Sequence, residues 1–110
     1  MRSDLEWALR QFGPAAELTR VKALSAGPFV RMHAIEIASR GTSRKLVIRR
    51  YTESEWIRRE PDLAAREAAV LQLLERTPGL RTPRLVAVDP DGHEVGSPTV
   101  LMTRLDGRTG

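Results

Sequence analysis

The sequence predicts an α+β domain in which an antiparallel sheet of about five strands carries one long helix on a face, with a short helix at the N-terminus. Two stretches, about 4–12 and 61–76, repeat apolar residues at helical spacing, whereas five shorter runs have the composition of strands and are separated by Gly and Pro. The chain has 110 residues, which is enough for one core and too few for two. We therefore expect a single domain over 1–110.

The N-terminal helix is predicted over about 4–12. Ser3 and Glu6 have the spacing of a capping box, in which the two side chains bond the first free backbone N–H groups of a helix. Apolar residues then recur at helical spacing until Gly13-Pro14. Those apolar residues are Leu5, Ala8, Leu9 and Phe12.

Three strands should follow this helix. Residues 17–26 alternate in part between polar and apolar and end at Gly27-Pro28, a turn signal. Residues 29–39 carry strand-forming side chains and end at a glycine turn, after which the run 46–51 is the most strand-like of the chain. The last two runs are expected to form a hairpin.

The second half should contain the long helix and two more strands. Residues 52–59 are polar and predict no element, whereas 61–76 begins with a proline and an acid that suit a first helical turn. Prolines then introduce the strand-like runs 84–88 and 99–103, and the segment 89–92 between them has the composition of a turn.

Composition excludes several classes of protein. Apolar residues make up 41% and charged residues 29%, so intrinsic disorder is excluded. There is no cysteine, and His33 and His93 lie far apart, so zinc is not expected. No apolar run reaches the roughly 18 residues that cross a membrane, and the N-terminus lacks the pattern of a secretion signal, so we expect a cytoplasmic protein without a membrane.

One carboxylate stands out on the long helix. Glu67 falls in the middle of an otherwise apolar face, and a carboxylate buried without a partner costs several kcal/mol. The face consists of Leu63, Glu67, Val70, Leu71 and Leu74. A cation should therefore lie beneath Glu67.

The candidate cation is Arg49, at an interior position of the most apolar strand. By the two-residue period of strands, Val47, Arg49 and Tyr51 share one face. We predict that Arg49 and Glu67 form an ion pair. The alternatives are an exposed arginine at a strand end, a solvated glutamate on a wide helix face, and a Val47 that is simply part of the core.

Four segments, in this order, resemble the N-terminal lobe of the aminoglycoside phosphotransferase-like kinases, a group that includes choline kinase-like enzymes. A basic residue on a strand paired to a glutamate on a helix is the device by which kinases hold nucleotide phosphates. The four segments are Leu46-Val47-Ile48-Arg49-Arg50, Ala65-Arg66-Glu67-Ala68-Ala69-Val70-Leu71, Thr82-Pro83-Arg84-Leu85 and Leu101-Met102-Thr103-Arg104-Leu105-Asp106-Gly107.

The resemblance implies roles for individual residues. Arg49 takes the place of the residue that contacts the phosphates, and Glu67 orients it. Val47 forms part of the ceiling over the base, Met102 guards the rear of the pocket, and backbone groups of Thr103 and Leu105 in a hinge at about 103–107 bind the edge of the base. The loop over the phosphates corresponds to 25–29, with Ser25 and Gly27 as its contributors.

The resemblance also implies an activity: transfer of the terminal phosphate of ATP or GTP, bound with Mg²⁺, to a hydroxyl of a small molecule. The catalytic and Mg²⁺-binding acids of such kinases belong to a C-terminal lobe that is absent from 1–110, so this chain alone should be inactive.

Two other functions stay open. A stand-alone half-kinase could serve as a binding or regulatory module that self-associates through an open cleft exposing Val47 and Met102. The net charge of +4, with Tyr51 and Trp56 close to several arginines, could suit single-stranded nucleic acid, although glutamates interrupt the basic run.

Overall fold

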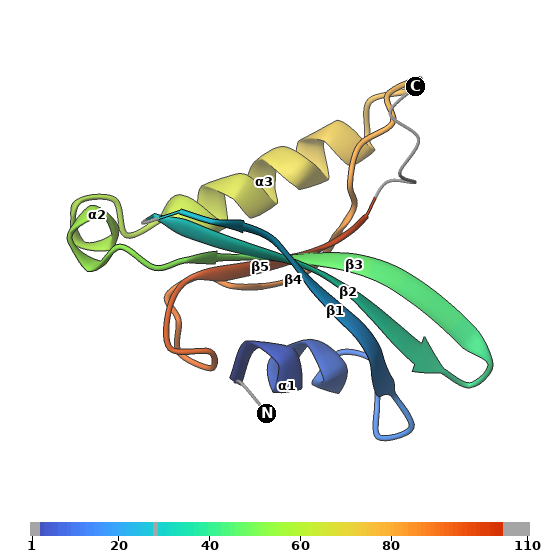
Figure 1. Cartoon of the computed structure of the whole chain (residues 1–110). Helices are drawn as coiled ribbons and strands as arrows, with labels where there is room; N and C mark the ends of the chain where they lie inside the picture. The colour runs from blue at the N-terminus through green and yellow to red at the C-terminus, as the bar shows by residue number, and fades with distance from the viewer. Residues whose placement is uncertain (1–2, 28, 105–110) are drawn as a thin grey trace.

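The architecture is a five-stranded antiparallel sheet with a helix on each face, in a computed structural model that describes residues 3–27 and 29–104, apart from the side chains of Ser25 and Ala26. The elements are α1 (Ser3–Arg10), β1 (Glu17–Ala26), β2 (Val30–Ser39), β3 (Thr42–Tyr51), α2 (Ser54–Arg59), α3 (Leu63–Glu75), β4 (Leu85–Asp89) and β5 (Thr99–Thr103). Figure 1 shows α3 along one face of the sheet, α1 against the other and α2 beside one end. The predicted fold class is confirmed.

The strands lie in the order β1-β2-β3-β5-β4, and every neighbouring pair is antiparallel. β2 and β3 form a hairpin whose two loop residues, Arg40 and Gly41, have φ values of 51° and 80°. Two positive φ values are what a tight hairpin turn requires, because this turn matches the twist of the strands. The predicted hairpin is thus confirmed, and β3 occupies the centre of the sheet.

Two apolar clusters lie on opposite faces of this sheet. One cluster joins α1 to alternate residues of β2, β3 and β5, and includes Trp7, which is 1% exposed. The other joins α3 to the intervening residues, among them Val47, Val100 and Met102. Because successive side chains of a strand point to opposite faces, Val47, Arg49 and Tyr51 lie together on the α3 face, as predicted.

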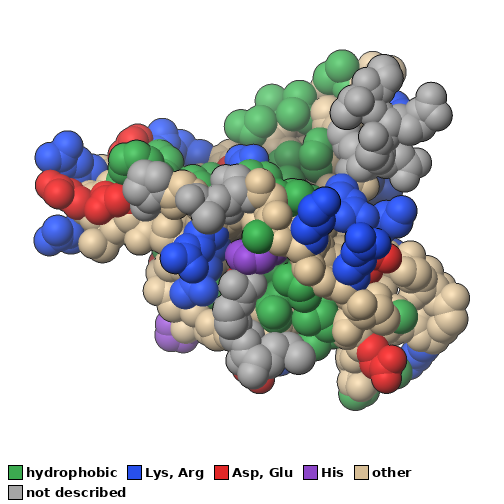
Figure 2. Space-filling view, viewed as in Figure 1, with side chains coloured by type: hydrophobic (Ala, Val, Ile, Leu, Met, Phe, Trp, Pro, Cys, Tyr) green, Lys and Arg blue, Asp and Glu red, His purple; other side chains and the backbone are tan. Residues whose placement is uncertain are grey.

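The buried face of α3 differs from the predicted one. Ala64, Ala68 and Leu71 are the buried residues of this helix, whereas Val70, assigned to the buried face from the sequence, is 53% exposed. Figure 2 shows hydrophobic side chains along α3 that face solvent. The helix sits on the sheet through its small alanines, which allow close approach, and the face is rotated accordingly, leaving Glu67 at its edge.

The short helix α2 was not predicted. None of its residues is buried, so no apolar periodicity marks it. It begins because the carboxylate of Glu53 accepts hydrogen bonds from the backbone N–H groups of Glu55, at 3.2 Å, and Trp56, at 2.6 Å. Such a cap satisfies donors that the first turn of a helix leaves free.

Candidate functional site

The predicted ion pair between β3 and α3 is present. Arg49 Nη1 donates to Glu67 Oε2, and the two side chains are 33% and 17% exposed. β3 is the central strand and α3 packs on the same face of the sheet, so both partners are held by regular elements. The alternatives of an unpaired strand-end arginine and a fully solvated glutamate are therefore wrong.

Tyr51 is a third member of this site, and its part was not predicted. Its hydroxyl donates to Glu67 Oε1 at 2.8 Å, so each oxygen of the carboxylate accepts from a different side chain of β3. Burial, followed by the hydrogen bond and the negative charge of Glu67, raises the pKa of Tyr51 to about 12. The two-residue period places Tyr51 on the correct face, but the contact depends on how far along β3 the helix sits.

Arg49 keeps donors that Glu67 does not use. Its Nη2 lies 3.8 Å from the sulfur of Met32, a weak acceptor, and its buried Nε has no hydrogen-bond partner among the described residues. A guanidinium carries five N–H donors in a planar fork that matches the oxygens of a phosphate. The partly exposed Arg49 can therefore bind an anion while it remains paired to Glu67.

The apolar residues beside Arg49 are covered. Ala34, Val47 and Met102 are direct neighbours across β2, β3 and β5, and they are 2%, 7% and 5% exposed. The prediction that an open cleft exposes Val47 and Met102 is therefore wrong, because both pack in the cluster beneath α3. The interpretation of Val47 as core is confirmed, whereas its contact with a base stays a prediction.

A small basic hollow of about 190 Å³ opens next to Ala34 on the same face of the sheet. Its charged lining residues are Arg20, Lys22, Glu36, Lys45 and Arg104. Glu36 Oε2 lies 3.9 Å from Arg20 Nη1 and 3.6 Å from Arg104 Nη2. With Lys22 and Lys45, one carboxylate therefore shares the hollow with four cations. This hollow was not predicted. Alternation along β1 to β3 places its strand residues on one face, but the register that brings them together is seen only in the structure.

The predicted base-binding hinge is described only in part. Thr103 ends β5, and its backbone N–H donates to the carbonyl of Arg84 at 2.9 Å. Its hydroxyl accepts from the N–H of Arg84 at 2.8 Å, so the carbonyl of Thr103 is the group that a base could still use. Leu105 and the rest of the hinge at about 103–107 beyond Arg104 lie outside the described residues.

The predicted phosphate loop joins β1 to β2. Ser25 stands opposite Met32 in the sheet, and the N–H of Gly27 donates to the carbonyl of Val30 at 3.3 Å. The side chain of Ser25 and all of Pro28 lie outside the described part of the chain. Because the N–H of Gly27 closes the turn and proline has none, this loop offers few donors to a phosphate.

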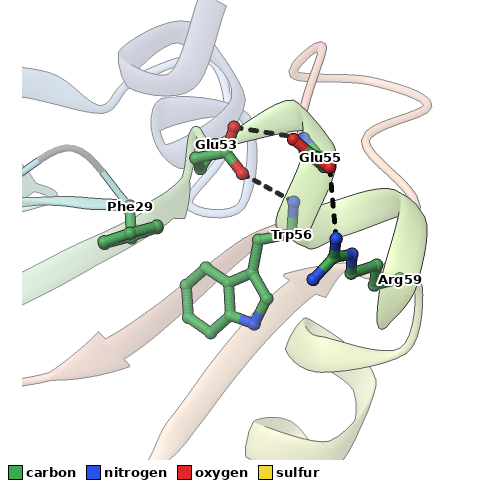
Figure 3. Close-up of a pocket in the computed structure, with 5 residues that line it drawn as sticks. All are labelled: Phe29, Glu53, Glu55, Trp56 and Arg59. Carbon is green, nitrogen blue, oxygen red and sulfur yellow. Dashed lines mark hydrogen bonds and ion pairs between the residues drawn. The ribbon is translucent and has the colours of Figure 1, made fainter.

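A larger hollow of about 720 Å³ opens beside α2, lined by Phe29, Glu53, Glu55, Trp56 and Arg59. Figure 3 shows the rings of Phe29 and Trp56 directed toward one another, edge to face, with centroids 5.5 Å apart. Trp56 also packs edge to face on Tyr51, which is 6% exposed. Tyr51 thus has no free ring face for a nucleic-acid base, contrary to that alternative.

Over residues 3–27 and 29–104 no group of three or more His, Asp or Glu side chains could hold a metal ion. Among the same residues, no helix is both long and apolar enough to cross a membrane.

Comparison with known proteins adds one finding. The family model described as "Phosphotransferase enzyme family" matches residues 36–110, a span that runs from β2 through Arg49 and Glu67 to the end of the chain. No curated protein and no solved structure matches the sequence significantly. The match confirms the resemblance drawn from the four sequence segments.

Proposed function

The chain belongs to the phosphotransferase enzyme family, and from this premise we propose that it is the nucleotide-binding lobe of an enzyme that transfers the terminal phosphate of ATP or GTP to a hydroxyl of a small molecule. The observation that carries the proposal is the Arg49–Glu67 pair, which a central strand and a packed helix hold at the edge of the core. It combines a fixed cation with unused donors.

In this proposal Arg49 contacts the inner phosphates of the nucleotide. Its guanidinium remains charged at all physiological pH values and can bind two phosphate oxygens at once. Glu67 fixes the plane of the guanidinium and offsets its charge when no nucleotide is bound. Positioning and charge stabilisation are the main contributions that a protein makes to phosphoryl transfer, so such a pair is an appropriate device.

The base is proposed to bind at the free end of β5. The carbonyl of Thr103 and the backbone of Leu105 supply its edge contacts, while Met102 and Val47 support this position from within the core. Mg²⁺ accompanies the nucleotide and offsets the charge of its phosphates. As the resemblance to the kinases implies, the ligands of Mg²⁺ and the catalytic acids are proposed to belong to a further lobe, and residues 1–110 alone are proposed to be inactive.

The test compares two variants with two matched controls in the full-length protein. Arg49→Ala and Glu67→Ala should weaken nucleotide binding about 10- to 100-fold, since hydrogen bonds to charged groups contribute about 1.5 to 3 kcal/mol. Arg50→Ala and Glu94→Ala are the controls: Arg50 donates to Ser97 from the opposite face of β3, and Glu94 Oε1 lies 3.8 Å from Nη2 of Arg10 in α1. Calorimetric binding and urea unfolding measure affinity and stability separately.

Two results would refute the proposal. One is a nucleotide affinity that the Arg49 and Glu67 variants leave unchanged. The other is a loss of affinity no larger than the accompanying loss of stability, which would make the pair merely structural.

A further inference from the structure

The carboxylate of Glu67 is held by a closed path of contacts that leaves α3, passes through β3 and α2, and returns to α3. The first steps are the hydrogen bond of 2.8 Å from Tyr51 to Glu67 and the edge-to-face contact of Tyr51 with Trp56, at 5.7 Å between centroids. Edge-to-face contact is a preferred arrangement of aromatic rings. Trp56 therefore helps the rest of the α3 cluster to hold the Tyr51 ring, and with it the hydroxyl, in place.

The return to α3 runs through Glu60, at the end of α2. Trp56 Nε1 donates to one oxygen of Glu60 at 3.1 Å, and Arg66 Nη2 donates to the other at 2.7 Å. The hydrogen bond from Arg66 is the main cause that lowers the pKa of Glu60 and keeps it ionised. Arg66 directly precedes Glu67 on α3, so the path closes within one residue of its start.

We propose that Tyr51 is a positioning residue for the nucleotide site, and that α2 acts through Trp56 to keep the Tyr51 hydroxyl on Glu67. Without this second donor the carboxylate is held only at Oε2 and can rotate about its last bond, which would turn the plane of Arg49. The inference rests on the proposed function, because it concerns how the guanidinium of Arg49 is oriented toward the phosphates of the nucleotide.

The geometry distinguishes this role from simple packing. Tyr51 is 6% exposed, and its ring fills space in the α3 cluster as a phenylalanine ring would. Only the hydroxyl reaches Glu67. Tyr51→Phe thus removes the positioning contact and preserves the packing, and the same substitution would have no effect on the site if the residue served only the core.

The first experiment measures nucleotide affinity in the full-length protein for Tyr51→Phe and Arg49→Ala together. Loss of one neutral hydrogen-bond donor should weaken binding about threefold to tenfold for Tyr51→Phe. A weakened Arg49→Ala with an unchanged Tyr51→Phe overturns the positioning role and leaves the proposed function intact. An unchanged Arg49→Ala overturns the proposed function, and the positioning role with it.

The second experiment tests the contact itself, independently of any nucleotide. Tyr51 is the only tyrosine of the chain, so the ultraviolet absorbance of tyrosinate reports this one residue. Its pKa of about 12 should fall in Glu67→Gln, which removes the charge that disfavours tyrosinate, and should stay unchanged in the control Glu75→Gln. Circular dichroism confirms that the chain stays folded. A Tyr51 pKa that does not respond to Glu67→Gln overturns the inference.

Discussion

Ionisation of Tyr51 should make the stability of the fold depend on pH in the alkaline range. The pKa of Tyr51 is about 12 in the folded chain, because burial and Glu67 disfavour its charged form, whereas a tyrosine in the unfolded chain has a pKa of about 10. The unfolded state thus loses its proton first. The contribution is fully present below about pH 10 and is lost as the pH rises through about 12.

The size of the effect follows from the two pKa values. A difference of about two pH units corresponds to at most about 2.7 kcal/mol, at about 1.36 kcal/mol per unit. Burial of Tyr51 is the main cause of the raised pKa. Glu67, which is 17% exposed and therefore partly screened by solvent, adds to it, whereas the charge of Arg49 lowers the pKa. We therefore expect about half of the maximum, or about 1.3 kcal/mol.

The assay is urea unfolding of the unaltered chain and of Tyr51→Phe at a series of pH values from about 9 to about 12.5. Lysine side chains lose their proton in the same range, but they do so in both proteins, so their contribution cancels in the difference. The unaltered chain should lose about 1.3 kcal/mol relative to Tyr51→Phe across the series. A difference in unfolding free energy that stays flat would refute the assigned hydrogen bond and burial.

Two further predictions concern the scaffold of the site. Gly92→Ala should destabilise the fold by about 2 to 4 kcal/mol, because Gly92 has a φ of +78° and an added Cβ would lie 2.6 Å from the backbone of Ser97. Thermal and urea unfolding measure this loss. A change below about 0.5 kcal/mol would contradict the turn geometry. Leu71→Ala should lower the free energy of unfolding by about 2 to 5 kcal/mol, because Leu71 is only 7% exposed. Val70→Ala should lower it by less than about 0.5 kcal/mol, because Val70 is 53% exposed. Equal losses would mean that α3 is oriented differently.

Most of the sheet could be predicted because its signals are local. Strand-forming side chains between Gly and Pro turns identified the runs 17–26 and 99–103 with the bounds that the structure has. The helix α2 could not be found in this way, since it buries nothing and depends on a contact between the Glu53 side chain and its own backbone neighbours. A cap of this kind has no periodicity and is visible in the sequence only as one acid before a short polar run.

Only the charged part of the site could be predicted. A carboxylate within an apolar helix face favours a nearby cation, and Arg49 was the candidate inside the most apolar strand. The residues alone left an exposed arginine and a solvated glutamate open, and the family resemblance favoured the pair. The apolar pattern overestimated the role of Val70, because a count of large residues ignores that Ala64 and Ala68 allow the helix to approach the sheet. The hydrogen bond between Tyr51 and Glu67 could not be predicted, because it depends on where α3 lies relative to β3. A pattern within a single helix or strand does not contain that information.

The energetics of Arg49 favour a role beyond stability. A partly buried ion pair loses hydration on both partners, and replacing such a pair with apolar residues is often neutral or even stabilising. The Nε of Arg49 is buried without an acceptor among the described residues, and such a group costs free energy. The side chain also lies beside Met32, which is apolar and would pack equally well against a hydrocarbon side chain. An arginine at this position is therefore unfavourable for the fold alone. The buried Nε is out of reach of a ligand, so an anionic ligand would gain its hydrogen bonds from the other donors of the partly exposed guanidinium.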